Sequence, residues 1–338
     1  MKLKQRIAAL AALGRHMAEG GPDWSEACTR ASEANAWFIP PFVGRAAGHI
    51  ASQHLDERLL TGFAESHGLT DDPAHPHTVG LVMAGNIPMV GMHDLLCVFL
   101  SGQKQVVKTS SKDRILMEHV IGWLHGHHPE TTGYVRTAEL LKGCDAYIAT
   151  GSDNTARHFE QYFGRHPHII RRNKTSVAVL DGTETAEELD GLSDDIQTYF
   201  GLGCRNVSQL LVPEGYEFVP LLEALRKYGF FLDSHKYHHN YDYNLAIQIM
   251  NNRFYMTNGS ILLTENESPF SPIGQLHYRH YAQGDNLSVM VDPEKVQCLV
   301  GHGQVPFGKA QQPTLGDFAD GVDTLEFLKD PRGFMNKA

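Results

Sequence analysis

The chain contains few cysteines and no long apolar run. Among its 338 residues there are five cysteines, none of them in a CxxC pair: Cys28, Cys97, Cys144, Cys204 and Cys298. An odd, scattered set of thiols excludes a disulfide framework and a zinc ribbon, and it is typical of a reducing compartment. No stretch approaches the ~20 apolar residues that cross a bilayer. We therefore expect a cytoplasmic protein with no membrane span.

An excess of positive charge is also missing, because 39 acidic residues outnumber 29 basic ones and the net charge is −10. That balance argues against nucleic acid as a partner. The nucleotide-binding patterns GxGxxG and GxxxxGK[ST] do not occur, and neither does the zinc pattern HExxH. The 20 histidines include clusters at residues 125–129, 166–168 and 235–239. We interpret these clusters as solvated and predict no metal site, with His235, His238 or His239 as a candidate general acid.

Apolar segments of strand length alternate with helical ones from residue 76 onward. Strand-like stretches lie at residues 78–85, 104–110, 133–137, 145–152, 168–172 and 176–182, and helix-like stretches lie between them at 89–102, 114–126 and 155–164. Such alternation predicts βαβ units and a doubly wound parallel sheet. We place this cofactor-binding domain at residues 76–183, with an N-terminal helical segment, residues 1–75, packed on it.

A second domain, which carries the candidate catalytic cysteine, is predicted at residues 184–300. Its helix-like stretches are 186–201 and 218–229, and its strand-like stretches are 209–216, 260–266 and 287–292. A C-terminal segment, residues 301–338, follows it. The fold class is therefore α/β.

Polar residues follow three of the predicted strands. Asn86 comes just after the first strand, where its amide suits an oxyanion donor; the alternative is a cap for the next helix. Lys108 ends the second strand, with Ser110 close behind, either to meet a cofactor or as a solvated strand end. Gly151 and Ser152 precede a helix whose N-terminus attracts phosphate, although a Gly-Ser turn alone is weak evidence.

Cys204 lies in the stretch YFGLGCRNVS, residues 199–208, between a predicted helix and a predicted strand. The neighbouring Arg205 would favour a reactive thiolate. The alternative is a structural, buried thiol, as we expect for Cys97 within the apolar run LLCVFL. Cys204 lies outside any such run.

Six stretches, in this order, resemble the aldehyde dehydrogenase superfamily and most closely its LuxC-type acyl-CoA reductases. They are AGNIP, VKTSS, TGS, RRNKTSVAVL, GLGCRNVSQLLVP and VPFGKAQQP, and the resemblance extends over residues 37–327. It implies an aldehyde dehydrogenase-like fold with two doubly wound parallel-sheet domains and a cleft between them. By this resemblance Cys204 matches the nucleophile, and Asn86 matches the residue that forms the oxyanion hole with the cysteine N–H.

The resemblance also implies cofactor contacts. Gly151 and Ser152 match the Gly-Ser beside the cofactor pyrophosphate, and Lys108 matches a lysine that contacts the adenosine ribose. Ser111 stands where many NAD-preferring relatives have a glutamate, so NADPH is favoured, with NADH as the alternative. Glu267, in ENESPFSP, is assigned to the nicotinamide ribose, although Ser268 has the direct spacing.

Ile170 occupies the position of the glutamate that activates water in aldehyde-oxidising relatives. Without that base, an acyl-cysteine should pass to hydride rather than to water. The basic residues that follow either meet ligand phosphates or form a solvated turn: Arg171, Arg172 and Lys174.

The resemblance therefore implies an NADPH-dependent enzyme that reduces a fatty acyl-CoA, a coenzyme A thioester, to the aldehyde through an acyl-cysteine thioester. Alternatives are an acyl phosphate or small semialdehyde as substrate, or a non-catalytic interaction subunit that retains the fold. We also expect a homo-oligomer, and an acyl-transfer or aldehyde-using enzyme as a partner.

Overall fold

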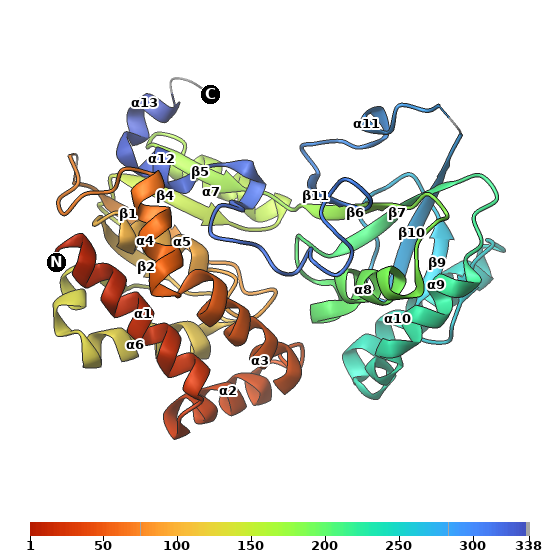
Figure 1. The fold of residues 1–338 in the computed structure, drawn as a ribbon, viewed down its shortest axis with the longest axis horizontal. Coiled ribbons are helices and arrows are strands. Elements are labelled where there is room, and N and C mark those ends of the chain that lie inside the picture. The colour runs from red at the N-terminus through yellow and green to blue at the C-terminus, as the bar shows by residue number, and fades with distance from the viewer. Residues whose placement is uncertain (75, 283, 336–338) are drawn as a thin grey trace. The chain divides into compact units, whose positions relative to one another are not determined.

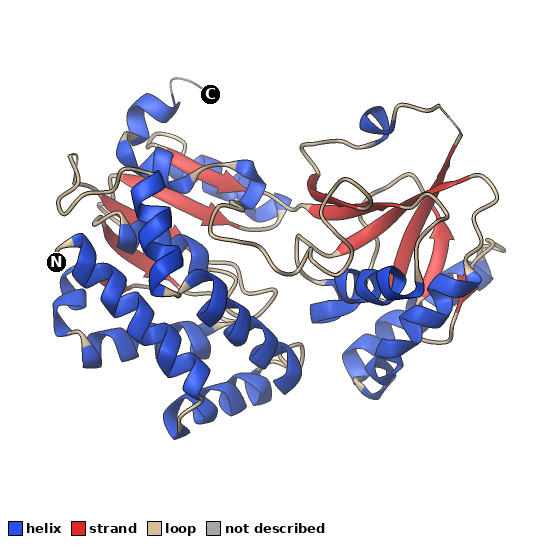
Figure 2. Cartoon of the chain, viewed as in Figure 1, coloured by secondary structure: helices blue, strands red, loops and turns tan. Residues whose placement is uncertain are grey.

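The computed structural model describes residues 1–74, 76–282 and 284–335. The chain divides into two compact units, each with its own sheet and its own helices (Figure 1, Figure 2). The first unit contains Met1–Asn173 and the C-terminal stretch from Thr314 onward, and the second contains Lys174–Pro313. Each unit is described by itself below.

Helices precede the first strand of the first unit. They are α1 (Leu3–Glu19), α2 (Pro22–Ala34), α3 (Pro40–His49), a π-helical turn (Ile50–His54) and α4 (Glu57–Ser66). Pro40 starts α3 because a proline at the first helical position costs no hydrogen bond. The buried Arg6 side chain ties α1 to the rest of the unit, since its Nε donates to Leu100 O at 3.1 Å and Nη1 donates to Asp71 O at 2.8 Å.

The first sheet is entirely parallel and has the strand order β3-β2-β1-β4-β5. Its strands are β1 (Thr78–Val82), β2 (Lys104–Lys108), β3 (Val135–Thr137), β4 (Ala146–Thr150) and β5 (His168–Arg171). The helices are α5 (Met92–Leu100), α6 (Arg114–His127), α7 (Asp153–Phe163), α12 (Thr324–Lys329) and α13 (Pro331–Met335). Apolar runs such as 78–82 form the middle strands because both faces of this sheet are covered.

The second sheet has the order β11-β6-β7-β10-β9-β8 and is parallel except for the β8–β9 pair. Its strands are β6 (Thr175–Val179), β7 (Val207–Pro213), β8 (Met256–Thr257), β9 (Leu262–Glu265), β10 (Gln275–Tyr281) and β11 (Val296–Val300). The helices are α8 (Ala186–Gln197), α9 (Val219–Ala224), α10 (His235–Met250) and α11 (Leu287–Met290). The apolar core of this unit includes Leu192, Leu210, Leu263 and Leu276.

Short 3-10 helices connect several of these elements. They are η2 (Pro129–Gly133), η3 (Thr198–Gly201), η4 (Leu225–Asp233) and η5 (Ala319–Gly321). Of these, η3 has a direct bearing on the candidate site, because it joins α8 to the turn that carries Cys204. Among the described residues, no helix is both long enough and apolar enough to cross a bilayer.

Two sequence predictions about the second unit are wrong. The strand predicted at 176–182 in the first domain is β6, which pairs with β7 and β11 in the second sheet. The stretch 287–292, predicted as a strand, contains the short helix α11. Both errors have one cause: a short apolar run shows neither which sheet will receive it nor whether it is a strand. Correspondingly, the units divide at Asn173 and Pro313 rather than at residues 183 and 300.

Candidate functional site

The predicted oxyanion donor and the predicted cofactor-binding residues of the first unit lie at one edge of its sheet. Asn86 follows β1, Lys108 ends β2, and Gly151 follows β4. Val82 lies opposite both Lys108 and Ala149, so the chain leaves these three parallel strands at the same level. The strand order also reverses between β1 and β4, and α/β sheets bind ligands at such a switch point. The structure therefore brings the predicted groups of this unit together.

The loops after β1 and β2 approach each other closely at Gly85. A Cβ on Gly85 would lie 2.5 Å from Ser110 Oγ and 3.1 Å from Asp113 Cβ, so only glycine fits there. The buried Asp113 carboxylate accepts from Met89 N at 2.7 Å, and burial raises the pKa of Asp113 well above its usual range. These contacts hold the loop that carries Asn86. Asp113 was not predicted from the sequence.

The exposed polar groups of this edge surround the two fixed loops. Lys108 and Ser111 are exposed, and Ser110 is half-buried. Ser152 is exposed and caps α7, because its Oγ accepts from Thr155 N at 3.4 Å. A Cβ on Gly151 would lie 3.0 Å from both Phe159 and Thr155 side chains, so glycine lets the strand approach the helix. A cation, hydroxyls and a helix N-terminus suit a phosphate-bearing cofactor.

The turn that carries Cys204 in the second unit begins in a strained backbone. Tyr199 and Phe200 both have φ of 57°, and Gly201 follows with φ of 73°. Bulky residues rarely adopt this left-handed conformation, which costs about 1–2 kcal/mol per residue. Both aromatic side chains are buried, and their packing holds the conformation. Cys204 then carries a reduced, half-buried thiol.

Asn206 fixes the backbone that precedes Cys204. Its Oδ1 accepts from Gly203 N at 2.7 Å, and its Nδ2 donates to Thr198 O at 2.8 Å. Ser176, on the neighbouring strand β6, donates from Oγ to Cys204 O at 3.1 Å. The thiol therefore stands on a turn whose peptide groups are already oriented.

A second loop, residues 306–311, is held against this turn. Arg205 donates from Nε to Ala310 O at 2.6 Å, so its side chain positions this loop. Asp195, near the end of α8, accepts from Gly308 N at 2.6 Å and from Ala310 N at 2.9 Å. Burial raises the pKa of Asp195 to about 7. Asp195 was not predicted from the sequence, although the VPFGKAQQP motif contains the loop that it binds.

Glu267 lies in the same unit as Cys204. The loop after β9 contacts the start of β7, where Gln209 Nε2 donates to Asn266 O at 3.0 Å and to Glu267 O at 3.1 Å. Ser208 Oγ also donates to Pro269 O. The side chain of Glu267 is exposed, whereas Ser268 is half-buried and donates to Phe270 O at 3.3 Å.

Several other candidate residues have structural roles or lie on the surface. Arg171 is buried in an ion pair with Asp94, which excludes it from the solvated basic turn and from contact with ligand phosphates. Arg172 pairs with Glu160 at the surface. Lys174 donates from Nζ to Pro293 O at 3.1 Å. The candidate general acids are exposed on α10: His235, His238 and His239.

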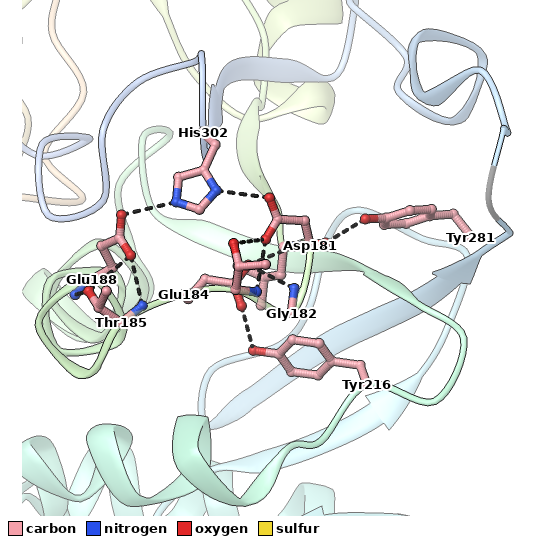
Figure 3. Close-up of polar contacts among 10 residues, drawn as sticks. Asp181, Gly182, Glu184, Thr185, Glu188, Tyr216, Tyr281 and His302 are labelled. Atoms are coloured by element: carbon pink, nitrogen blue, oxygen red, sulfur yellow. Dashed lines mark hydrogen bonds and ion pairs between the residues drawn. The ribbon is translucent and has the colours of Figure 1, made fainter.

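A hydrogen-bonded network around His302 shifts the pKa values of its members strongly (Figure 3). His302 Nδ1 lies 2.9 Å from Asp181 Oδ2, and Nε2 lies 3.0 Å from Glu188 Oε1. These carboxylates raise the pKa of His302 to about 9, while hydrogen bonds from Thr183 and His302 lower that of Asp181 to about 2. Asp181 follows the carboxyl end of β6, whereas Cys204 precedes β7. Since β6 and β7 are parallel, the network stabilises the opposite edge of the sheet.

Comparison with known proteins identifies the fold. No family model matches the sequence, and no curated protein matches it. Solved structures do match. An aldehyde dehydrogenase of Mycobacterium tuberculosis, complexed with NAD+, has a TM-score of 0.62 and 14% identity over 86% of this chain and 71% of that one.

Two further structures are similar in the same way. An NADP-dependent enzyme of E. coli has a TM-score of 0.62 and 12% identity over 86% of this chain and 70% of that one. Aldehyde dehydrogenase 21 of Physcomitrella patens, in complex with succinate, has a TM-score of 0.64 and 11% identity over 89% of this chain and 74% of that one. The predicted aldehyde dehydrogenase-like fold is therefore confirmed. At these identities the likeness shows the fold alone.

Proposed function

We propose that the chain is an oxidoreductase that reduces an acyl-CoA to the aldehyde, with NADPH as reductant and Cys204 as nucleophile. The observation that carries this proposal is the placement of Cys204. Its thiol is half-buried on a turn that follows two strained aromatic residues and is braced by Asn206. Backbone strain of this kind is concentrated at functional sites, whereas a thiol that only fills space needs no such turn.

Cys204 would act by attacking the thioester carbonyl. The thiolate forms a C–S bond, the carbonyl becomes a tetrahedral oxyanion, and the C–S bond to coenzyme A then breaks, with its electron pair leaving on the coenzyme A thiolate. Asn86 and the N–H of Cys204 are the proposed donors to the oxyanion. Removing one donor of this kind typically slows a reaction by about 10²–10³.

The edge of the first sheet fits a nicotinamide cofactor. Gly85 and Gly151 are positions where a Cβ would collide with neighbouring side chains, while Lys108 and Ser152 are exposed beside them. A bound nicotinamide would supply the hydride that reduces the acyl carbon. We propose that Lys108, Ser110, Ser111, Gly151 and Ser152 hold its adenosine and phosphate groups, with Glu267 at the nicotinamide ribose.

NADPH is favoured over NADH by the charge near Ser111. Both Ser111 and Lys112 are exposed, and a hydroxyl beside a cation can accept a 2′-phosphate. A carboxylate at that position would instead bond a free 2′-hydroxyl. Both cofactors occur with this fold, since the M. tuberculosis structure contains NAD+ and the E. coli enzyme depends on NADP.

Reduction is favoured over hydrolysis by the residue at position 170. Ile170 is half-buried on β5 and has no group that can take a proton from water. An acyl-cysteine with no general base at this position should survive long enough to accept a hydride. Collapse of the resulting thiohemiacetal releases the aldehyde and restores the Cys204 thiolate.

The covalent step can be tested separately from the reduction. We expect an acyl-CoA supplied without NADPH to add one acyl group to the protein, as seen in its intact mass. Cys204→Ser should lose the adduct and at least ~10³ of the turnover. Cys28→Ser is the matched control, because Cys28 is a half-buried thiol of the first unit. Normal turnover by Cys204→Ser would disprove the nucleophile.

The substrate and cofactor need a second comparison. Turnover should be faster with acyl-CoA than with an acyl phosphate or a small semialdehyde, and NADPH should be consumed faster than NADH. Faster turnover of an acyl phosphate would favour the alternative substrate. If neither nicotinamide nucleotide shifts the melting temperature, the non-catalytic subunit is the better interpretation.

A further inference from the structure

Two histidines and one aspartate meet on the helices of the first unit, in residues that the proposed reaction does not use. His16 is on α1, Asp23 on α2 and His119 on α6. The Nε2 atoms of the two histidines are 3.1 Å apart, and His16 Nε2 lies 3.8 Å from Asp23 Oδ2. All three ligand atoms lie within 4.8 Å of one another.

Aromatic rings hold both imidazoles in place. The Trp123 ring stacks on His16 with centroids 4.8 Å apart and planes at 18°. The ring centroid of Trp24 lies 6.0 Å from that of His16, in an edge-on contact, and 5.4 Å from that of His119, with the planes at 57°. The His16 side chain is 10% exposed. The two nitrogens therefore face each other head-on, with ring centroids 5.4 Å apart and planes at 16°, and packing holds both rings in that arrangement.

We propose that His16, His119 and Asp23 bind one divalent transition-metal ion of the zinc class. Two nitrogens at ~2.0–2.1 Å from a tetrahedral zinc lie about 3.3 Å apart, close to the observed 3.1 Å. Asp23 Oδ2 must move inward, from 3.8 Å to about 3.3 Å from His16 Nε2, which its 59% exposed side chain permits. Water would complete the coordination.

The electrostatic surroundings favour neutral imidazoles. Burial lowers the pKa of both His16 and His119, so both rings are neutral at neutral pH, the form that binds a metal. The charges of Asp23 and Glu19 oppose the lowering of the His16 pKa, and His127 adds to it. For His119, Asp23 opposes the lowering and Arg30 adds to it. The ion would be released as acid protonates the two rings.

A bound ion would link α6 to two consecutive helices, α1 and α2, that lie far from it in the sequence. His16 and His119 are 103 residues apart, so the ion would connect the N-terminal helices to α6 within the first unit. Without an ion the same two nitrogens can share one proton in an N–H···N hydrogen bond. A measurable affinity for a metal ion would distinguish the metal site from a simple hydrogen-bonded pair of histidines.

The experiment uses the full chain without an affinity tag, stripped of metal by a chelator. We expect Zn²⁺ to bind with one ion per chain by calorimetry, and Co²⁺ to give the intense visible absorption of a four-coordinate site. At a hundredfold excess over Kd, the melting temperature should rise by about 5–10 °C. Wild-type protein that binds neither ion would overturn the proposal.

The variants assign the ligands. His16→Asn and His119→Gln should abolish binding, and Asp23→Asn should weaken it at least tenfold. His158→Asn is the control, because His158 is an exposed histidine on α7 of the same unit, and this variant should bind Zn²⁺ as the wild type does. Circular dichroism shows whether each variant is folded. If a histidine variant unfolds, the metal affinity of Asp23→Asn, whose side chain is exposed, tests the ligand assignment instead. Unchanged affinity in Asp23→Asn together with either histidine variant would overturn the assignment.

Discussion

Single residues determine how closely the backbone segments at the candidate site can approach. Gly85 allows the loops after β1 and β2 to meet, and Gly151 allows β4 to meet α7. Tyr199 and Phe200 show the reverse case, because side-chain packing keeps bulky residues in a conformation that usually requires glycine. The first two positions belong to predicted motifs. The strained pair does not follow from the sequence, since propensity favours ordinary backbone for aromatic residues.

Gly85→Ala tests the close approach of these loops. The new methyl would displace the side chains of Ser110 and Asp113, so we expect a loss of about 1–3 kcal/mol in the free energy of unfolding and weaker NADPH binding. Gly62→Ala is the control. A Cβ on Gly62, exposed in α4, would meet nothing within 4 Å, and alanine there should be neutral or stabilise by up to about 1 kcal/mol. Chemical denaturation and cofactor titration measure both effects; equal stability of the two variants would contradict the prediction.

At the scale of elements, helix α8 connects the His302 network at one of its ends with the loop beside Cys204 at the other. Glu188, in its first turn, belongs to the His302 network, while Asp195, in its last turns, holds residues 306–311. Thr185 caps the helix and forms a capping box with Glu188. This cap is visible in the sequence as TAEE. The sequence does not reveal what the Asp195 carboxylate binds, because its partners are backbone N–H groups more than 110 residues away.

A buried ion pair joins three elements of the first unit. Arg171, at the end of β5, pairs with Asp94 on α5, and its Nη2 donates to Thr324 Oγ1 on α12 at 3.0 Å. The two charged side chains are 5% and 11% exposed. These contacts therefore attach α12 to the sheet.

Asp94→Asn should be strongly destabilising, because it leaves the Arg171 charge buried without a counter-charge. We expect a loss of about 3–5 kcal/mol. Arg172→Gln breaks the neighbouring pair with Glu160, in which both side chains are about half exposed, and should cost at most about 1 kcal/mol. Urea unfolding curves for both variants provide the comparison. Similar urea midpoints for the two variants would show that the buried Arg171–Asp94 pair stabilises the fold no more than the exposed Arg172–Glu160 pair does.

At the scale of the whole molecule, pH should act on the second unit through His302. The folded pKa of about 9 lies above the ordinary 6.5, so its contribution is complete below pH 6.5 and is lost as the pH rises through 9. The contribution of Asp181 to stability has the opposite dependence on pH. Its folded pKa of about 2 lies below the ordinary 3.8, so its contribution is complete above pH 3.8 and is lost as the pH falls through 2.

His302→Asn should therefore lower the melting temperature most between pH 4 and 6.5, and the difference from wild type should vanish by about pH 10. The network is exposed, so 1 M salt should also reduce the difference. His235→Asn replaces an exposed histidine of α10 and should show no such pH profile. Thermal unfolding followed by circular dichroism across this range tests the prediction. A difference that grows above pH 7 would be inconsistent with it.

Local pattern in the sequence was enough to predict the α/β class, most helices and strands, and the candidate residues at the ends of β1, β2 and β4, because these depend on neighbouring residues. Contacts in the folded chain were needed to show that β6 joins the second sheet, that Arg171 is buried, and that Asp195 and Asn206 hold the turns around Cys204. Only the tertiary structure brought His16, Asp23 and His119 together. These outcomes depend on contacts between residues distant in the chain, and hydrophobic periodicity does not specify which distant segments will pair.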